Sequence, residues 1–270
     1  GADDEQLARR WPAHHIVGKD ILRFHAVIWP AMLMAAGLDV PKGVFGHGWL
    51  LVGGEKMSKS KLTGIAPEEI TSTFGSDAFR YYFMRAIAFG QDGSFSWEDL
   101  AARYQAELAN GFGNLGSRVI AMITRYFDGA VPAAGSLTEA DEHVLDTARR
   151  VTDAAQAAID RFAPHDALAS VWELVDVLNG YITEQEPWAL AKDPVERERL
   201  GTVLHTAYRG LGTLAVLLTP VLPVATAKLW SALGGSGEIT AQRIDRAADW
   251  EGAASVGALE PLFPRIESAA

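Results

Sequence analysis

The chain has 270 residues, 49% of them hydrophobic, and a formal net charge of −10. This length and composition can fill the core of one large domain or two smaller ones, which excludes an intrinsically disordered protein. The absence of cysteine excludes disulfide scaffolds and thiolate metal sites. It also gives no sign of an oxidising compartment, so we expect a cytoplasmic protein. Because no apolar run reaches the roughly eighteen residues of a membrane span, we expect no membrane partner.

The negative charge is concentrated in the second half of the chain. Residues 1–135 carry a balance of −1, whereas residues 136–270 carry −9. An acidic chain is not typical of general nucleic-acid binders, because phosphate neutralisation requires clustered lysine and arginine. The densest basic cluster is residues 53–64, GGEKMSKSKLTG, where Lys56, Lys59 and Lys61 stand between glycines. Any site for a polyanion should therefore be local.

The first hundred residues alternate between strand-like and helix-like segments. HHIVG (14–18) and VFGHGWLLV (44–52) predict strands. Residues 20–36 contain no glycine and predict a helix that is kinked or restarted at Trp29-Pro30. A strand, a crossover helix and a second strand predict part of a parallel α/β sheet. Since two strands are too few for a stable sheet, we expect part of the domain to be missing.

From about residue 97 the sequence predicts almost only helices. Apolar positions repeat at helical spacing over residues 100–127 and in later segments that open near a capping residue or a proline. These later segments are residues 137–162, 164–185, 194–218 and 220–233. The short connections between them favour an antiparallel bundle. The predicted fold class is therefore α/β followed by all-α, with a link at residues 92–97.

The basic segment at residues 53–64 has the composition of a loop that binds a polyphosphate. Its glycines allow the backbone to approach a ligand closely, and its ammonium groups can converge on the ligand's charge. On composition alone, a solvated surface loop is an equal alternative. Met57 favours a packed loop, because a large apolar side chain has little use in a purely solvated one.

Two motifs carry a resemblance to a known family. KMSKS, residues 56–60, resembles the mobile lysine loop of class I aminoacyl-tRNA synthetases. GKDILRFHAVIWPAML, residues 18–33, is similar to the segment that precedes this loop in methionyl-tRNA synthetases, and HGWLLVGGEKMSKS continues the match. The resemblance extends from about residue 15 to about residue 233. It implies the second half of a Rossmann-like nucleotide-binding domain followed by an antiparallel helical anticodon-binding domain.

The resemblance implies ATP-dependent activation of L-methionine to methionyl-adenylate and its transfer to tRNA(Met). Mg²⁺ would accompany ATP, and no metal site within this chain is implied. Lys59, assisted by Lys56, would stabilise the charge that develops on the phosphoryl oxygens. The family's ATP-binding positions fall on Gly18, Asp20, His47, Gly48, Lys56, Met57, Ser58, Lys59 and Ser60.

Four residues of the second motif share one face of the predicted helix. Ile21, His25 and Trp29 recur every four positions, and Phe24 lies beside them. Aliphatic, imidazole and aromatic side chains form a wall suited to a polarisable thioether. On periodicity alone, a core stripe with a buried histidine is the preferred alternative. The resemblance reverses that preference, since it places these four positions around the methionine side chain.

The helical half contains two segments that resemble the family's anticodon-reading positions. They are NGFGNLGSR (110–118) and EQEPWALAK (184–192). Asn114 and Arg118 share a helix face and can offer amide and guanidinium groups to base edges, while Trp188 can stack on an unpaired base. Without the resemblance, a helix-packing Asn114 and a core Trp188 are preferred. With it, we expect these three residues to bind the anticodon.

The resemblance implies three regions. Residues 1–96 would form the C-terminal part of a Rossmann-type catalytic domain and residues 97–235 the anticodon-binding domain, with a tail at 236–270. The sequence lacks the His-x-Gly-His motif and the inserted zinc-type domain of the family. We therefore expect a fragment, or one of two chains, that needs the N-terminal half of the catalytic domain and is inactive alone. A non-catalytic tRNA-binding module is the alternative, and a helical adaptor with coincidental motifs a remoter one.

Overall fold

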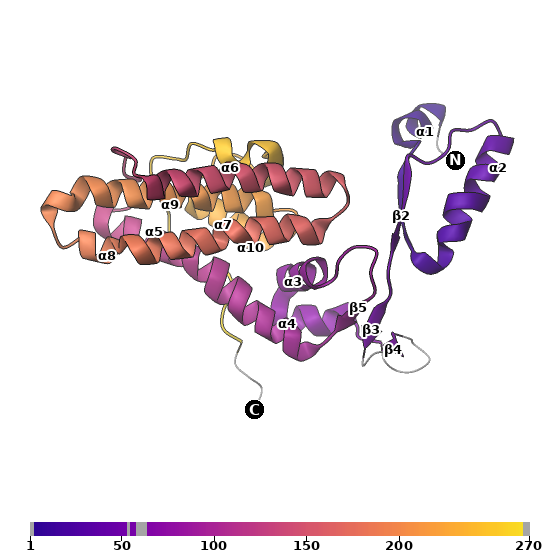
Figure 1. Cartoon of the computed structure of the whole chain (residues 1–270), viewed down its shortest axis with the longest axis horizontal. Coiled ribbons are helices and arrows are strands. Elements are labelled where there is room, and N and C mark those ends of the chain that lie inside the picture. Colours follow the sequence, from indigo (N-terminus) through magenta and orange to yellow (C-terminus); the bar gives the residue numbers. More distant parts are fainter. Residues whose placement is uncertain (1–2, 53–54, 58–63, 267–270) are drawn as a thin grey trace. The chain divides into compact units, whose positions relative to one another are not determined.

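The computed structural model describes residues 3–52, 55–57 and 64–266 (Figure 1). The chain divides into two compact units. Unit 1 takes residues up to Gly64 together with residues 87–96, and unit 2 takes residues 65–86 and those from Trp97 onwards. Residues 65–86 therefore group with the helices, while the domain limits expected from the sequence stay predictions. Within the described residues, no helix has both the length and the apolar character needed to cross a bilayer.

Unit 1 contains two small sheets. Helix α1 (Asp4–Arg10) precedes strand β1 (His14–Gly18), which pairs in parallel with β2 (Gly43–His47) so that Gly18 lies opposite His47. In the second sheet, β3 (Leu50–Val52) has the antiparallel β4 (Glu55–Lys56) on one side and the parallel β5 (Gly93–Phe95) on the other. The parallel pairing predicted for the first two strands is confirmed.

The single strand predicted over residues 44–52 is wrong, because the structure divides it between the two sheets. The break falls at Gly48, where an added Cβ would lie 2.0 Å from the backbone oxygen of Gln91. Trp49 then donates its backbone N–H to Asp92 Oδ1 at 2.8 Å, and Gly93 donates its own to Trp49 O at 2.9 Å. This close approach of residues 91–93 turns the chain out of the first sheet.

The helical stretch predicted over residues 20–36 changes its winding along its length. It begins as the 3₁₀ turn η1 (Lys19–Ile21), continues as the π-helix η2 (Phe24–Ile28) and ends as α2 (Trp29–Ala35). Pro30 occupies the first turn of α2, where its missing N–H is not needed for a helical hydrogen bond. The winding therefore changes at Trp29, where the sequence predicts a kink or restart, but the backbone stays in the right-handed helical region on both sides.

The described part of unit 2 consists mainly of helices. They are α3 (Pro67–Ala86), α4 (Trp97–Arg103), the π-helix η4 (Tyr104–Gly113), α5 (Asn114–Phe127), α6 (Glu139–Asp160), α7 (Pro164–Gln185), α8 (Pro187–Leu190), η5 (Pro194–Glu196), α9 (Arg197–Leu218), α10 (Pro223–Ala232), η6 (Ile239–Ala241) and η7 (Ile244–Asp249). The helices predicted from residue 100 onwards are confirmed. The sequence does not predict α3, whose serines, threonines and Gly75 (φ 82°) weaken the helical pattern.

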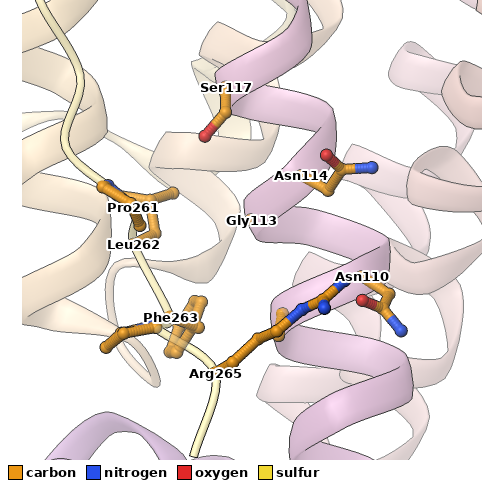
Figure 2. A pocket seen from close by; sticks show the side chains of 10 residues that line it. Asn110, Gly113, Asn114, Ser117, Pro261, Leu262, Phe263 and Arg265 are labelled. Atoms are coloured by element: carbon orange, nitrogen blue, oxygen red, sulfur yellow. The ribbon is translucent and has the colours of Figure 1, made fainter.

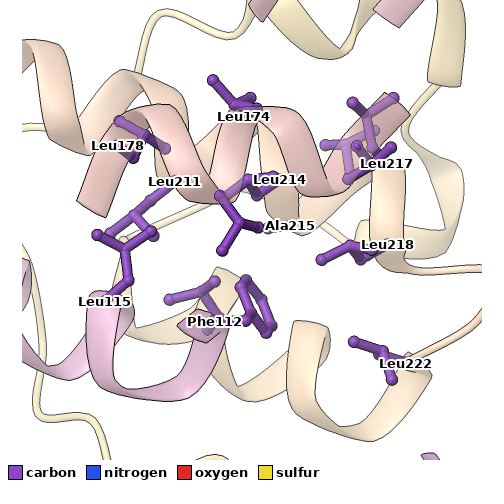
Figure 3. Packing of buried hydrophobic residues seen from close by; sticks show 14 of the residues in the cluster. Phe112, Leu115, Leu174, Leu178, Leu211, Leu214, Ala215, Leu217, Leu218 and Leu222 are labelled. Carbon is purple, nitrogen blue, oxygen red and sulfur yellow. The ribbon is translucent and has the colours of Figure 1, made fainter. Parts of the chain in front are cut away.

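The core of unit 2 surrounds α9, whose side chains are buried almost continuously from Leu200 to Leu218. Figure 3 shows Phe112 and Leu115 facing α9, with Leu174 and Leu178 of α7 nearby. All four side chains are fully buried. Each such burial contributes about 1.5–3 kcal/mol, and a helix that is apolar on every side needs neighbours all around it. Helices α6, α7 and α9 accordingly pack against one another (Figure 1).

The residues after η7 form a strap, defined here as residues 250–266, along the bundle. Trp250 lies 5.0 Å from Tyr208 and 5.2 Å from Trp230 between ring centroids. At the other end of the strap, the Phe263 ring meets Tyr104 edge-on at 6.0 Å. The strap therefore covers side chains of the helical core.

A buried carboxylate joins three helices of unit 2. Asp141 of α6 accepts hydrogen bonds from Tyr181 of α7 and from both terminal guanidinium nitrogens of Arg199 of α9. It also closes a capping box with Thr138. Burial alone raises the pKa of Asp141, but the hydrogen bonds from Arg199, Tyr181 and Thr138 outweigh it and lower the pKa to about 2.

Replacing Asp141 with alanine should lower the free energy of unfolding by about 3–5 kcal/mol, because Arg199 then loses its buried partner. The exposed Asp146 on the same helix is the matched control, and Asp146→Ala should change the free energy by less than about 0.5 kcal/mol. Urea unfolding of the chain at pH 7 measures both.

The contribution of Asp141 should also depend on pH. Because its folded-state pKa lies below the unfolded value of about 3.9, its stabilisation is present above pH 4 and is lost as the pH falls toward about 2. A stability difference between wild type and Asp141→Ala that does not shrink over this range would contradict the assignment.

Candidate functional site

Gly18, Asp20 and His47 meet at the carboxyl ends of β1 and β2. A Cβ added to Gly18 would lie 2.7 Å from Asp20 Oδ1 and 3.8 Å from His47 Cε1. His47 Nδ1 lies 2.9 Å from Gly48 O, and because a carbonyl only accepts, this nitrogen carries the hydrogen. Ligands of open parallel sheets bind beyond the carboxyl ends of the strands. The structure thus gathers Gly18, Asp20, His47 and Gly48 at an edge suited to a nucleotide.

Lys19, between two of these residues, forms an ion pair with Asp92. Its Nζ lies 2.5 Å from Asp92 Oδ1 and 4.2 Å from the centroid of the Trp49 ring. The hydrogen bond from Lys19, followed by that from the Trp49 backbone, lowers the pKa of Asp92. Asp92 is therefore an ionised carboxylate that contacts two segments of unit 1.

The described part of the lysine loop is its base. Lys56 pairs with Leu51 across β3 and β4, and the Met57 N–H donates to Leu50 O at 3.0 Å. The Met57 side chain is partly buried. The predicted loop residues Ser58, Lys59 and Ser60 lie outside the described residues. Strand β3 therefore anchors the loop on its N-terminal side.

The residues predicted to surround an apolar side chain lie together on η1, η2 and α2. Ile21, Phe24 and Trp29 are 42%, 57% and 38% exposed, and His25 is partly buried. No other described part of this chain covers these side chains completely. The π-helix η2 carries Phe24 and His25, and π-helical turns occur frequently at functional sites. These four residues form one wall with an open side.

The orientation of His25 is set by its own helix. Its Nδ1 lies 3.1 Å from Ile21 O, and because a carbonyl only accepts, this nitrogen donates. The His15 ring, from β1, meets the His25 ring edge-on with a centroid distance of 5.8 Å. The wall therefore presents a histidine whose ring is held by a backbone carbonyl of its own helix.

In unit 2 the structure brings Arg118 and Trp188 together. The guanidinium carbon of Arg118 on α5 lies 6.0 Å from the centroid of the Trp188 ring on α8. Trp188 is 39% exposed, which does not agree with a core anchor. Asn114, at the start of α5, is exposed one turn before Arg118. A face with an amide, a guanidinium and an indole can bind and stack an unpaired base.

A pocket of about 420 Å³ lies beside Asn114 (Figure 2). Asn110, Asn114 and Ser117 line one side, and the strap lines the other with Phe263 and Arg265. Figure 2 shows the Arg265 side chain extending from the strap toward Asn110. The pocket thus offers amide, hydroxyl and guanidinium groups beside an aromatic ring, which are groups that contact nucleotides.

Comparisons with known proteins give two family matches along the chain. Residues 2–120 match the family model "tRNA synthetases class I (M)", and residues 141–263 match "Anticodon-binding domain of tRNA ligase". The methionine–tRNA ligase of Streptomyces coelicolor is 50% identical over 97% of this chain. The chain belongs to the methionyl-tRNA synthetase family. It spans about half the length of the S. coelicolor relative, 51%.

Solved structures of methionyl-tRNA synthetases share the fold. The Mycobacterium tuberculosis enzyme in complex with methionyl-adenylate has a TM-score of 0.92 and 36% identity, covering 97% of this chain and 52% of that one. Its apo form has a TM-score of 0.89 and 34% identity, covering 98% and 52%. The predicted fold class, a Rossmann-like part followed by a helical anticodon-binding domain, is confirmed.

Three residues near these sites carry no functional signal of their own in the sequence: Asn110, Asp92 and Arg265. Asn110 stands one turn before Asn114 within the quoted motif, so only this spacing could indicate it. Asp92 lies 73 positions from Lys19, and no local pattern connects the two. Arg265 lies in the tail, to which the sequence assigns no function. In the described parts of the chain, no group of three or more His, Cys, Asp or Glu side chains is arranged to hold a metal ion.

Proposed function

We propose that this chain supplies one half of the catalytic site and the anticodon-binding domain of an enzyme that joins L-methionine to tRNA(Met) with ATP. The observation that carries the proposal is the open wall of Ile21, Phe24, His25 and Trp29 in the unit that also gathers Gly18, Asp20 and His47. A wall for a thioether beside a sheet edge for a nucleotide suits formation of methionyl-adenylate.

The nucleotide residues and the lysine loop have separate tasks in this reaction. The methionine carboxylate, already ionised at neutral pH, attacks the α-phosphate of ATP, and pyrophosphate leaves. Lys59, with Lys56, stabilises the charge that builds on the phosphoryl oxygens. Asp20 and Gly18 hold the ribose at the end of β1. Mg²⁺ would enter with ATP, whose phosphate oxygens and water would supply its ligands.

The methionine side chain lies against the exposed wall. Phe24 and Trp29 offer apolar, polarisable surface to the thioether, and Ile21 fills the space beside them. The Nδ1–H of His25 is engaged by Ile21 O, so the ring stays fixed while the side chain enters. Tight recognition requires a second wall, because pockets that bind small molecules enclose most of their ligand's surface.

We infer that this second wall comes from the N-terminal half of the catalytic domain, so the chain is inactive alone. The His-x-Gly-His motif of the family does not occur in this sequence, and the chain spans about half of its relative. Regions 1–96 and 97–235 then act as the second part of the catalytic domain and as the anticodon-binding domain. Charging of tRNA for protein synthesis would take place in the cytoplasm.

The anticodon is read by the exposed face around Asn114, Arg118 and Trp188. Arg118 lies close enough to the Trp188 ring for both to contact one base, the first by hydrogen bonds and the second by stacking. The pocket with Asn110 and Arg265 lies beside Asn114 and offers room for a neighbouring nucleotide. The acidic balance of the second half, −9 over residues 136–270, restricts RNA binding to such local sites.

Methionine-dependent exchange between pyrophosphate and ATP tests the proposal directly. The chain alone should give no exchange, and adding an N-terminal fragment that carries the His-x-Gly-His strand should restore it, because the two halves complete the pocket. The same fragment mixed with the Lys59→Ala chain should restore little. Binding of tRNA without exchange in any mixture would contradict the proposal and favour a non-catalytic tRNA-binding module.

In the full-length enzyme, Lys59→Ala should slow adenylate formation by about a hundredfold or more, because one donor to the developing charge is lost. The dissociation constant of methionine should change by less than about threefold, because Lys59 acts on the phosphates. Burst kinetics and equilibrium binding measure the two quantities. Lys42→Ala, at an exposed lysine of the same unit, is the control and should alter neither. Equal losses in both would rule out the assigned role.

Trp188→Ala should raise the KM for tRNA(Met) by about tenfold or more, since stacking on an aromatic side chain contributes about 1–3 kcal/mol per base. Methionine-dependent pyrophosphate exchange without tRNA should stay unchanged. Trp188→Phe should retain most of the affinity, and Val195→Ala, at another exposed residue between α8 and α9, should have no effect. An unchanged KM in Trp188→Ala would remove this residue from the anticodon site.

A further inference from the structure

The carboxylate of Asp92 connects separate segments of unit 1. Its Oδ1 accepts the Lys19 ammonium at 2.5 Å and the Trp49 backbone N–H at 2.8 Å. The Lys19 ammonium also lies over the Trp49 ring, 4.2 Å from its centroid. Lys19 follows β1, Trp49 precedes β3, and Asp92 precedes β5. The Asp92 carboxylate therefore links the end of β1 with the segments that lead into β3 and β5.

The Lys19 ammonium is engaged within the cluster of Lys19, Trp49 and Asp92. It stands between Gly18 and Asp20, the predicted ribose residues, and a lysine at that position would be an obvious ligand for a phosphate. Its ammonium is instead paired with Asp92, and the pairing lowers the pKa of that carboxyl. The contacts of Lys19 are those of a residue that holds two parts of the site together.

Backbone contacts connect Trp49 and Asp92 with the base of the lysine loop. Trp49 leads directly into β3, whose Leu51 pairs with Lys56 and whose Leu50 accepts the Met57 N–H. Asp92 leads into β5, the other neighbour of β3, and Gly93 bonds to Trp49 O. The tight backbone contact between Gly48 and Gln91 also holds the segments that precede β3 and β5 close together. A displacement at Asp92 is therefore passed through backbone hydrogen bonds to the first lysine of the loop.

The geometry points to Lys19 and Asp92 as positioning residues that align the base of the lysine loop with the nucleotide end of β1. This inference rests on the proposed function, because it assigns the two residues a task in adenylate formation. Lys19 and Asp92 are partly exposed, 38% and 33%, and such ion pairs contribute little to overall stability. Their loss should therefore reduce the rate through misalignment, since a shift of about 1 Å between reacting groups can cost a hundredfold in rate.

The test uses the full-length enzyme with Lys19→Met and Asp92→Asn. The asparagine oxygen can still accept the Trp49 N–H, so this variant removes the charge and keeps the backbone contact. Each variant should reduce kcat for methionine-dependent pyrophosphate exchange by about tenfold. The KM values for methionine and ATP should stay within about twofold, and Tm should stay that of wild type. Lys19→Arg, which keeps the ion pair, should recover most of kcat.

Glu173→Gln is the matched control. It breaks the exposed ion pair of Glu173 with Arg150 on the helical unit and should leave kcat unchanged. Three results would overturn the inference: wild-type kcat in both variants, a raised KM for ATP at constant kcat in Lys19→Met, or a fall in Tm that parallels the loss of activity. Failure of the proposed function would look different, since wild-type enzyme would then show no methionine-dependent exchange at all.

Discussion

The close contact between the backbones of Gly48 and Gln91 constrains the arrangement of unit 1. No side chain larger than hydrogen fits at Gly48, where a Cβ would lie 2.0 Å from a carbonyl oxygen. The chain must therefore leave the first sheet directly after His47 and start a second one at Leu50. This turn leaves His47 at the end of β2 beside Gly18 and sends β3 toward the lysine loop. The backbone contact at Gly48 thus determines where the ends of β2 and β3 lie.

Much of the fold follows from patterns within single segments. The strand at residues 14–18, the change of winding at Trp29-Pro30 and the helices after residue 100 all result from local apolar spacing and from the geometry of proline. The division of residues 44–52 between two sheets does not follow from such patterns, because its cause lies at Gln91 and Asp92. Helix α3 is not predicted for a local reason, because Gly75 and its polar neighbours interrupt the helical spacing of apolar residues. The strap packs against aromatic rings that are distant in the sequence, so no local pattern predicts its position.

The candidate site shows the same division between local and distant causes. Motif residues such as Ile21, His25 and Trp29 are found from their spacing, and the resemblance supplies their meaning. Spacing says nothing about the partner of Lys19, because the ion pair forms only when β1 and the segment before β5 have folded together. Likewise, nothing near Arg265 in the sequence connects it with Asn110. Motif spacing therefore indicates the residues of a proposed site, while their long-range partners emerge only from the tertiary structure.

The short connection before α8 restricts the backbone from which the exposed indole of Trp188 extends. Glu186 adopts the left-handed conformation, φ 43° and ψ 56°, which is uncommon for a residue with a side chain, and the buried Pro187 follows it. Both restrict the backbone that carries Trp188. The conformational entropy of ordering this segment is consequently lost when the protein folds, before any RNA is present. On the proposed function, a base that stacks on Trp188 would meet a preorganised surface, and more of the stacking free energy would remain available as affinity.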